Sequence, residues 1–230
     1  MKVNIVILAA GKTKLEGIKK EYPHCLQEVD GIPVLEKIVQ NSRTISNATY
    51  NFVFLNDEVK QYHLDNIARL LVPDAQFTKV LKQTKGSACT CLLATIPMNQ
   101  DSELLVISAN ELVKMSFNRI LENFRQKKYD AGTLIFHSVH PRYSYVRLDE
   151  SNLVIETSQR DPISSNATAG IFWYKRTSDF VKGAKDLIRK NAHVDGSYFV
   201  APIFNELVLN HKRVGVLELM EGSYIPLKDE

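Results

Sequence analysis

The chain has 230 residues, of which 44% are hydrophobic and 24% charged, an ordinary composition for a soluble globular protein with a substantial core. Its net charge of +3 is small and its basic residues are scattered, so composition gives no support for a nucleic-acid partner. No apolar run approaches the roughly 18 residues of a membrane helix, and the apolar start at residues 3–10 is too short for a secretory signal, so we expect a cytoplasmic protein without membrane insertion.

The first half of the sequence alternates strand and helix patterns. Residues 3–10 are nearly continuously apolar and rich in β-branched side chains, which is typical of a strand covered on both faces of a parallel sheet. The alternation that follows favours a doubly wound sheet. The expected strands are 51–55, 76–81 and 103–108, and the expected helices are 34–39 with Pro33 in the first turn, 57–71 capped by Asp57, 87–95 and 116–126.

The second half has shorter gaps between its strands. Ser151 and Asn152 predict a hairpin turn between two of them. The sequence contains no internal repeat, low-complexity segment or linker, so we expect one domain over residues 1–230 with a mixed sheet. The expected strands are 131–136, 143–148, 153–157, 167–174 and 214–219, and the expected helices are 178–190 and 202–209.

The three cysteines, Cys25, Cys89 and Cys91, cannot all pair within the chain. Cys89 and Cys91 are too close in sequence for the common zinc or redox patterns. We therefore expect buried free thiols in a reducing compartment.

Ligands of an open α/β sheet bind at the carboxyl ends of its strands, which nominates the loops after Ala10, Leu81 and Ser108. In the first loop, Gly11 lets backbone N–H groups approach a phosphate and Lys12 adds charge, although a solvated basic loop explains the same residues. The glycine and lysine spacing does not fit a Walker loop.

The second loop, residues 83–88, combines Gln83 with a glycine that permits an unusual turn and a serine that could cap the next helix. Such a helix start presents donors and acceptors to a base or phosphate, and an ordinary capped loop is the alternative. We expect that a tryptophan at Gly86 would abolish nucleotide binding and leave the fold intact.

Together these segments resemble the sugar-phosphate nucleotidyltransferases. That family opens with Leu-Ala-Ala-Gly-x-Gly-x-Arg, then Pro-Lys-x-Leu, then Gly-x-Pro and two apolar residues, and residues 5–11, 22–26 and 31–35 follow this order. Residues 83–88 resemble the family's base-recognition turn, and residues 104–110 lie where the family has a strand ending in its metal-binding aspartate. The further matches are 143–149, 161–164, 166–170, 198–202 and 205–207.

The resemblance covers essentially the whole chain and is greatest to short bacterial enzymes of capsule and surface-polysaccharide clusters. It implies a Rossmann-like, three-layer α/β/α domain with a mainly parallel sheet. It also implies attack by a phosphate monoester, usually a sugar phosphate, on the α-phosphorus of a nucleoside triphosphate, with Mg²⁺ as cofactor. The implied nucleotide-binding residues are Ala10, Gly11, Gln83, Gly86 and Ser87.

Several charged positions of the family pattern are altered. The second glycine and the arginine of the opening are Thr13 and Leu15, so Lys12 or Lys14 would have to supply the charge, without the bidentate fork of arginine. The lysine of Pro-Lys-x-Leu is His24, which is cationic only near or below a pKa of about 6.5.

The metal and substrate positions differ too. The metal-binding aspartate is Asn110, which offers an amide oxygen without charge, and Glu111 is the neighbouring alternative. A family Glu-Lys pair is Gln159-Arg160, of which Arg160 could hold a substrate phosphate. The implied catalytic residues are therefore Lys12, Lys14, His24 and Arg160, the substrate-binding residues are Gln159, Asn166 and Gly170, and the metal ligands are Asn110 and Glu111.

Three alternatives to an active enzyme stay open. A catalytically silent homologue would bind a nucleotide, a nucleotide sugar or a partner protein. A glycosyltransferase would carry an Asp-x-Asp motif, which the sequence lacks. A pure interaction protein would bind no nucleotide and would expose a sizeable apolar patch. A homo-oligomer is compatible with all of these.

Overall fold

The computed structural model describes residues 2–10, 12–13 and 22–227, with the side chains of Lys12, Thr13 and Tyr22 excepted. Four parallel strands form one half of its main sheet, in the order β8-β1-β6-β7. β1 (Val3–Leu8) lies between β6 (Ala48–Leu55) and β8 (Glu103–Ser108), and β7 (Gln76–Val80) is the edge strand. Val3, Ile5 and Ile7 pack into one apolar core and Val6 into a second core on the opposite face, which explains the unbroken apolar run of β1.

The other half of the main sheet is mixed. β13 (Asn166–Tyr174) runs antiparallel to β8, and β10 (Ala131–His137) pairs antiparallel with β13 and parallel with β14 (Val214–Glu218). β11 (Ser144–Leu148) and β12 (Val154–Gln159) form a hairpin beside the start of β13. The predicted mixed, mainly parallel sheet is confirmed.

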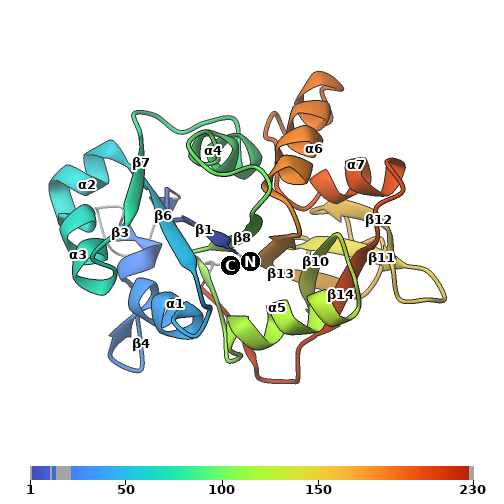
Figure 1. Cartoon of the computed structure of the whole chain (residues 1–230), viewed down its shortest axis with the longest axis horizontal. Helices are drawn as coiled ribbons and strands as arrows, with labels where there is room; N and C mark the ends of the chain where they lie inside the picture. Colours follow the sequence, from blue (N-terminus) through green and yellow to red (C-terminus); the bar gives the residue numbers. More distant parts are fainter. Residues whose placement is uncertain (1, 11, 14–21, 228–230) are drawn as a thin grey trace.

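Helices cover both faces of the main sheet (Figure 1). α4 (Ser87–Ala94), α6 (Thr177–Arg189) and α7 (Ile203–Leu209) cover one face and surround the core that contains Val6. α1 (Val34–Ser42) and α5 (Phe117–Gln126) cover the other face, with α2 (Asn56–Tyr62) and α3 (Leu64–Leu71) beside its parallel half. The architecture is the predicted three-layer α/β/α arrangement. No helix in the described part of the chain is both long and apolar enough to cross a membrane.

Short strand pairs and one 3-10 helix were not predicted. β9 (Glu111–Val113) follows β8 and pairs with β15 (Tyr224–Pro226), which brings the last described strand next to the end of β8. The remaining short elements lie between β1 and α1: β2 (Lys12–Thr13), β3 (Tyr22–Pro23), η1 (His24–Leu26), β4 (Glu28–Val29) and β5 (Ile32–Pro33).

Three local predictions were wrong. The helix expected over 57–71 is two helices, because His63 adopts a left-handed conformation with φ 54° between α2 and α3. Asp57 does not cap it, since α2 begins at Asn56 and its cap residue makes no side-chain hydrogen bond. Pro33 precedes the first turn of α1 instead of lying in it.

The hairpin turn at Ser151 and Asn152 is confirmed. Asn152 adopts a positive φ of 58°, and the carboxylate of Asp149 accepts hydrogen bonds from the backbone N–H groups of Ser151 and Leu153. The turn joins β11 to β12 and thereby sets the hairpin that forms one wall of the site below.

Candidate functional site

A cavity of about 300 Å³ opens where the four parallel strands of the main sheet end. Each strand contributes its last residues to the lining: Leu8 to Ala10 after β1, Leu55 from β6, Val80 from β7, and Ser108 to Asn110 after β8. We call this space the first cavity. Its position matches the expectation that ligands bind at the carboxyl ends of the strands. The lining is completed by His24, Gln83, Thr84, Gly86, Ser87, Thr90 and Ser197.

Gly86 fixes the turn that leads into α4. Its φ of 106° and ψ of 171° form a conformation that glycine adopts readily and other residues rarely adopt. A Cβ placed on it would lie 2.2 Å from the backbone oxygen of Tyr198. Tyr198 donates its N–H to the oxygen of Lys85 at 2.7 Å and accepts from the N–H of Ala88 at 3.0 Å. The start of α4 is thus joined to the segment before α7 by backbone contacts that only glycine allows.

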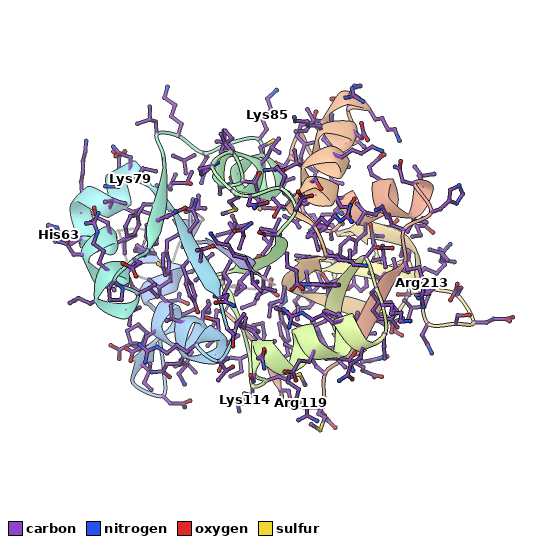
Figure 2. The ribbon with its side chains drawn as sticks, in the orientation of Figure 1. His63, Lys79, Lys85, Lys114, Arg119 and Arg213 are labelled. Carbon is purple, nitrogen blue, oxygen red and sulfur yellow. The ribbon has the colours of Figure 1, made fainter. Side chains whose placement is uncertain are left out.

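Two expectations about this turn were wrong. Ser87 is the first residue of α4 and Gly86 the cap residue, with no side-chain hydrogen bond at the cap. A tryptophan at Gly86 cannot leave the fold intact, since any side chain there collides with the Tyr198 backbone. Lys85, although next to the turn, projects outward on the side of α4 (Figure 2) and does not line the first cavity.

The predicted nucleotide-binding residues within the described chain come together. Ala10, Gln83, Gly86 and Ser87 all line the first cavity, beside the predicted catalytic residue His24. Gly11 and Lys14 lie outside the described residues. The backbone of Lys12 pairs with Pro23 in the β2–β3 ladder, and its side chain lies outside the described residues.

A second cavity of about 390 Å³ lies beside the first. Ser87, Ser108 and Asn110 line both, so the two spaces meet where β8 ends. The other lining residues are Glu111, Arg142, Ser144, Gln159, Arg160, Thr168, Gly170, Phe172, Phe199, Val200 and Ala201.

Glu111 is held from several sides. Its side chain packs so closely on Gly170 that a Cβ there would lie 2.7 Å from the carboxylate, which gives Gly170, with φ 62°, a reason to be glycine. The hydroxyl of Tyr224 donates to the carboxylate at 3.0 Å. Burial, followed by the charge of Glu111, raises the pKa of Tyr224 far above its ordinary value, so this hydroxyl stays protonated.

Asn110 and Glu111, the predicted metal ligands, both line the second cavity. The described residues contain no cluster of three or more His, Cys, Asp or Glu side chains that could hold a metal ion. Asn110 has a buried Oδ1 without a hydrogen-bond partner, which could be one neutral ligand, but Glu111 is only 3% exposed and is bonded to Tyr224. Magnesium in nucleotide sites is held by one or two carboxylates together with waters and the phosphates of the substrate, so this pair would supply a single carboxylate and Mg²⁺ stays a prediction.

The predicted substrate residues are only partly brought together. Gln159, Arg160 and Gly170 line the second cavity, whereas Asn166 does not and instead pairs with His137 at the start of β13. Gln159 accepts a short hydrogen bond from Ser144. The guanidinium of Arg160, 2.9 Å from the carboxylate of Asp195, forms a largely exposed ion pair.

Sequence reasoning missed Arg142, Ser197 and Tyr224. Tyr224 reaches the site through the β9–β15 pairing, and Ser197 through the contacts of its neighbour with the Gly86 turn, so no local pattern announces either. Arg142 lies just before the strand expected at 143–148, and its basic side chain at the start of a strand was the available signal.

The model of one known family matches most of the chain. The model described as nucleotidyl transferase matches residues 4–210. No curated protein sequence matches the chain.

Solved structures share the fold at low sequence identity. A nucleoside-diphosphate-sugar pyrophosphorylase from Vibrio cholerae RC9 aligns with a TM-score of 0.77 and 16% identity over 97% of this chain and 95% of that one. An inositol-1-phosphate CTP transferase from T. maritima aligns with a TM-score of 0.73 and 14% identity over 98% of this chain and 89% of that one. A UDP-glucose pyrophosphorylase complexed with UDP-glucose aligns with a TM-score of 0.72 and 14% identity over 95% of this chain and 91% of that one.

Proposed function

The chain belongs to the nucleotidyl transferase family, and from this premise we propose that it transfers a nucleotidyl group from a nucleoside triphosphate in the first cavity to a phosphate monoester in the second. The observation that carries the proposal is that Ser87, Ser108 and Asn110 line both cavities, which makes the two cavities adjacent. A nucleotide base near Gln83 and an acceptor near Gln159 would place their phosphates at this junction.

The proposed reaction is a displacement at the α-phosphorus. A phosphate oxygen of the acceptor forms a new O–P bond, the bond from that phosphorus to the bridging oxygen of the β-phosphate breaks, and pyrophosphate leaves. Positioning and neutralisation of charge are what such a step requires of the protein. On the acceptor side, Arg142 and Arg160 supply positive charge. On the nucleotide side, His24 lines the cavity, and Lys12 or Lys14 remains the predicted source of charge.

The acceptor we propose is a sugar phosphate, and the pathway is the synthesis of a surface-polysaccharide precursor. The support is the sequence resemblance together with the identities of the structural neighbours, which include two sugar-nucleotide pyrophosphorylases and one inositol-1-phosphate transferase. A polar lining formed by Ser144, Gln159 and Thr168 suits the hydroxyl groups of a sugar.

A second candidate function is the binding of a finished nucleotide sugar without transfer. The observation that favours it is the lining of the first cavity, which among the described residues contains no carboxylate, lysine or arginine. A nucleotide sugar carries less charge than a triphosphate and would fill both cavities at once.

The test is a pyrophosphate-release assay over a panel of nucleoside triphosphates and sugar phosphates, combined with thermal shifts for the same ligands and for nucleotide sugars. Transfer predicts pyrophosphate release that needs both a triphosphate and a phosphate monoester. A ligand at 100 times its dissociation constant stabilises by about 2.7 kcal/mol, which for a domain of this size shifts Tm by roughly 5 to 10 °C.

A matched pair of variants locates the nucleotide. Gln83→Trp adds bulk to the first cavity at an exposed position, so it should remove the nucleotide-induced shift and keep the fold. Lys82→Trp, at the neighbouring exposed residue outside the lining, is the control. Stabilisation by a nucleotide sugar without any pyrophosphate release would decide for the second candidate, and equal shifts in both variants would contradict the location.

A further inference from the structure

Arg142 is a cationic side chain of the second cavity that the sequence did not identify as functional. It lines the cavity beside Ser144 and Gln159, and it is partly buried. Its Nε is buried and has no hydrogen-bond partner. No salt bridge within the described part of the chain includes it. A buried donor without an acceptor is destabilising, so an anion that accepts its hydrogen bond would be bound favourably.

The surroundings hold Arg142 in place before any ligand arrives. Its guanidinium lies 5.0 Å from the ring centroid of Tyr143, which is a cation–π contact. Tyr143 itself is only 4% exposed. Its backbone N–H donates to Nδ1 of His140, whose carbonyl accepts from the hydroxyl of Tyr145. The ring of Tyr143 in turn meets Phe136 edge-on at 5.0 Å. A guanidinium fixed in this way loses little freedom on binding an anion.

Arg160, the other arginine of the second cavity, is engaged elsewhere. Its guanidinium forms an ion pair with Asp195 and lies 5.8 Å from the ring centroid of Phe199. To bind a substrate it would have to exchange the carboxylate of Asp195 for the new anion, which reduces the net gain.

We infer that Arg142, and not Arg160, is the principal anion-binding residue of the second cavity, and that it binds the phosphate of a phosphate monoester. Arginine presents parallel N–H donors that match two phosphate oxygens, and such charge-assisted bonds are the stronger class. The inference rests on the proposed function, because it identifies the group that recognises the acceptor.

The experiment measures the affinity of inorganic phosphate by titration calorimetry at constant ionic strength. Arg142→Gln should weaken binding about tenfold, which corresponds to the loss of one charge-assisted hydrogen bond. Arg142→Lys keeps the positive charge without the parallel N–H donors of the guanidinium, so its phosphate affinity should lie between those of the unchanged protein and Arg142→Gln. Arg119→Gln is the matched control, since it removes the same charge from an exposed side chain at the outer side of α5 (Figure 2) and should bind phosphate as the unchanged protein does. Circular dichroism verifies that each variant is folded.

Two further variants place the phosphate. Gln83→Trp should leave phosphate binding intact, because it obstructs only the first cavity. Arg160→Gln should weaken binding less than Arg142→Gln does. The inference is overturned if Arg142→Gln binds phosphate normally, if Arg160→Gln has the larger effect, or if Gln83→Trp abolishes phosphate binding.

Nucleoside triphosphates titrated into the same proteins separate this inference from the proposed function. If the unchanged protein binds a triphosphate but not phosphate, the role of Arg142 is wrong and the nucleotide site stands. If it binds neither ligand, the proposed function fails and the inference fails with it. Triphosphate binding that persists in Arg142→Gln while phosphate binding is lost supports both.

Discussion

Asn110 stands at the junction of the two cavities, where its uncharged Oδ1 is buried without a partner. A carboxylate at this position would add the negative charge that a divalent cation requires. We expect nucleoside triphosphates to bind the unchanged protein about equally with Mg²⁺ and with a chelator. In the Asn110→Asp variant, triphosphate affinity should fall in the chelator, because the new carboxylate repels the phosphates, and should recover with Mg²⁺. We expect the affinity of this variant to be about tenfold higher with Mg²⁺ than with the chelator, which corresponds to about 1.4 kcal/mol.

Calorimetric titration in the two buffers measures that ratio. Asn66→Asp, the same change at an exposed residue of α3, should show no Mg²⁺ dependence beyond that of the unchanged protein. A strong requirement for Mg²⁺ in the unchanged protein would show that the metal finds ligands other than Asn110 and Glu111, and would contradict this expectation.

Cys25, next to His24, is a buried thiol whose protonation is coupled to stability. Burial, with a smaller contribution from Glu58, raises the pKa of this thiol from 9.0 to about 12. The unfolded chain therefore loses the proton first as pH rises, and the folded state loses stability between pH 9 and 12, while below pH 9 the contribution is fully present. Between pH 8 and 10 this one group should cost about 1.4 kcal/mol.

Urea unfolding at the two pH values, compared between the unchanged protein and Cys25→Ala, isolates that contribution. The variant is less stable at both values because it leaves a small cavity, but its free energy of unfolding should fall less from pH 8 to 10. Parallel pH dependences for the two proteins would mean that the thiol does not titrate as its burial predicts.

At the scale of elements, the turn before α4 depends on Gly86. Its φ of 106° and its contact with the Tyr198 backbone together predict that Gly86→Ala lowers the free energy of unfolding by about 2–4 kcal/mol and displaces Ser197, with loss of nucleotide affinity. Gly31→Ala is the control, since Gly31 also has a positive φ of 72° but no atom within 4 Å of an added Cβ. Its cost should be limited to about 1–2 kcal/mol. Equal costs in urea unfolding would show that the Tyr198 contact is not limiting.

Elements whose own residues form a continuous apolar run could be predicted from sequence. Short strands that form only by pairing with a segment far away in the chain could not. Residues 3–10 and 103–108 carry a local signal of burial on both faces, and both form central strands close to the expected bounds. β9 and β15 are three residues long and exist because they pair with each other across most of the chain, so neither has a pattern of its own. His63 broke an expected helix because its left-handed backbone overrides an amphipathic period that continues on both sides.

The candidate site divides in the same way. Residues that directly follow parallel strands, such as Ala10 and Asn110, could be placed by the topology rule and do line the first cavity. Arg142 and Arg160 could not be ranked from sequence, because their difference lies in partners, Asp195 for one and a tyrosine ring for the other. Asn166 was expected at the substrate, but it lies four residues before Gly170 along β13 and outside the cavity.

At the scale of the whole molecule, the last described strand, β15, lies outside the family match, which ends at residue 210, and packs against the residues that follow β8. Tyr224 stacks on Phe136 of β10 with ring centroids 4.0 Å apart and donates to Glu111 of β9. The backbone N–H of Leu227 donates to the backbone carbonyl oxygen of Asn110 at 3.1 Å. The C-terminal segment thus contacts two separate parts of the chain, β10 and the residues that directly follow β8.

These contacts predict that the hydroxyl of Tyr224 contributes more to the free energy of unfolding than an ordinary hydroxyl does. Tyr224→Phe keeps the ring stack and removes one hydrogen bond to a buried carboxylate, which should lower the free energy of unfolding by about 1.5–3 kcal/mol. Tyr50→Phe removes a 2.9 Å bond to the neutral hydroxyl of Ser42 and should cost about 1 kcal/mol. Urea unfolding with unchanged m-values measures both. If Tyr224→Phe costs no more than Tyr50→Phe, Glu111 is held by its other contacts, and the C-terminal strand packs beside it without fixing it.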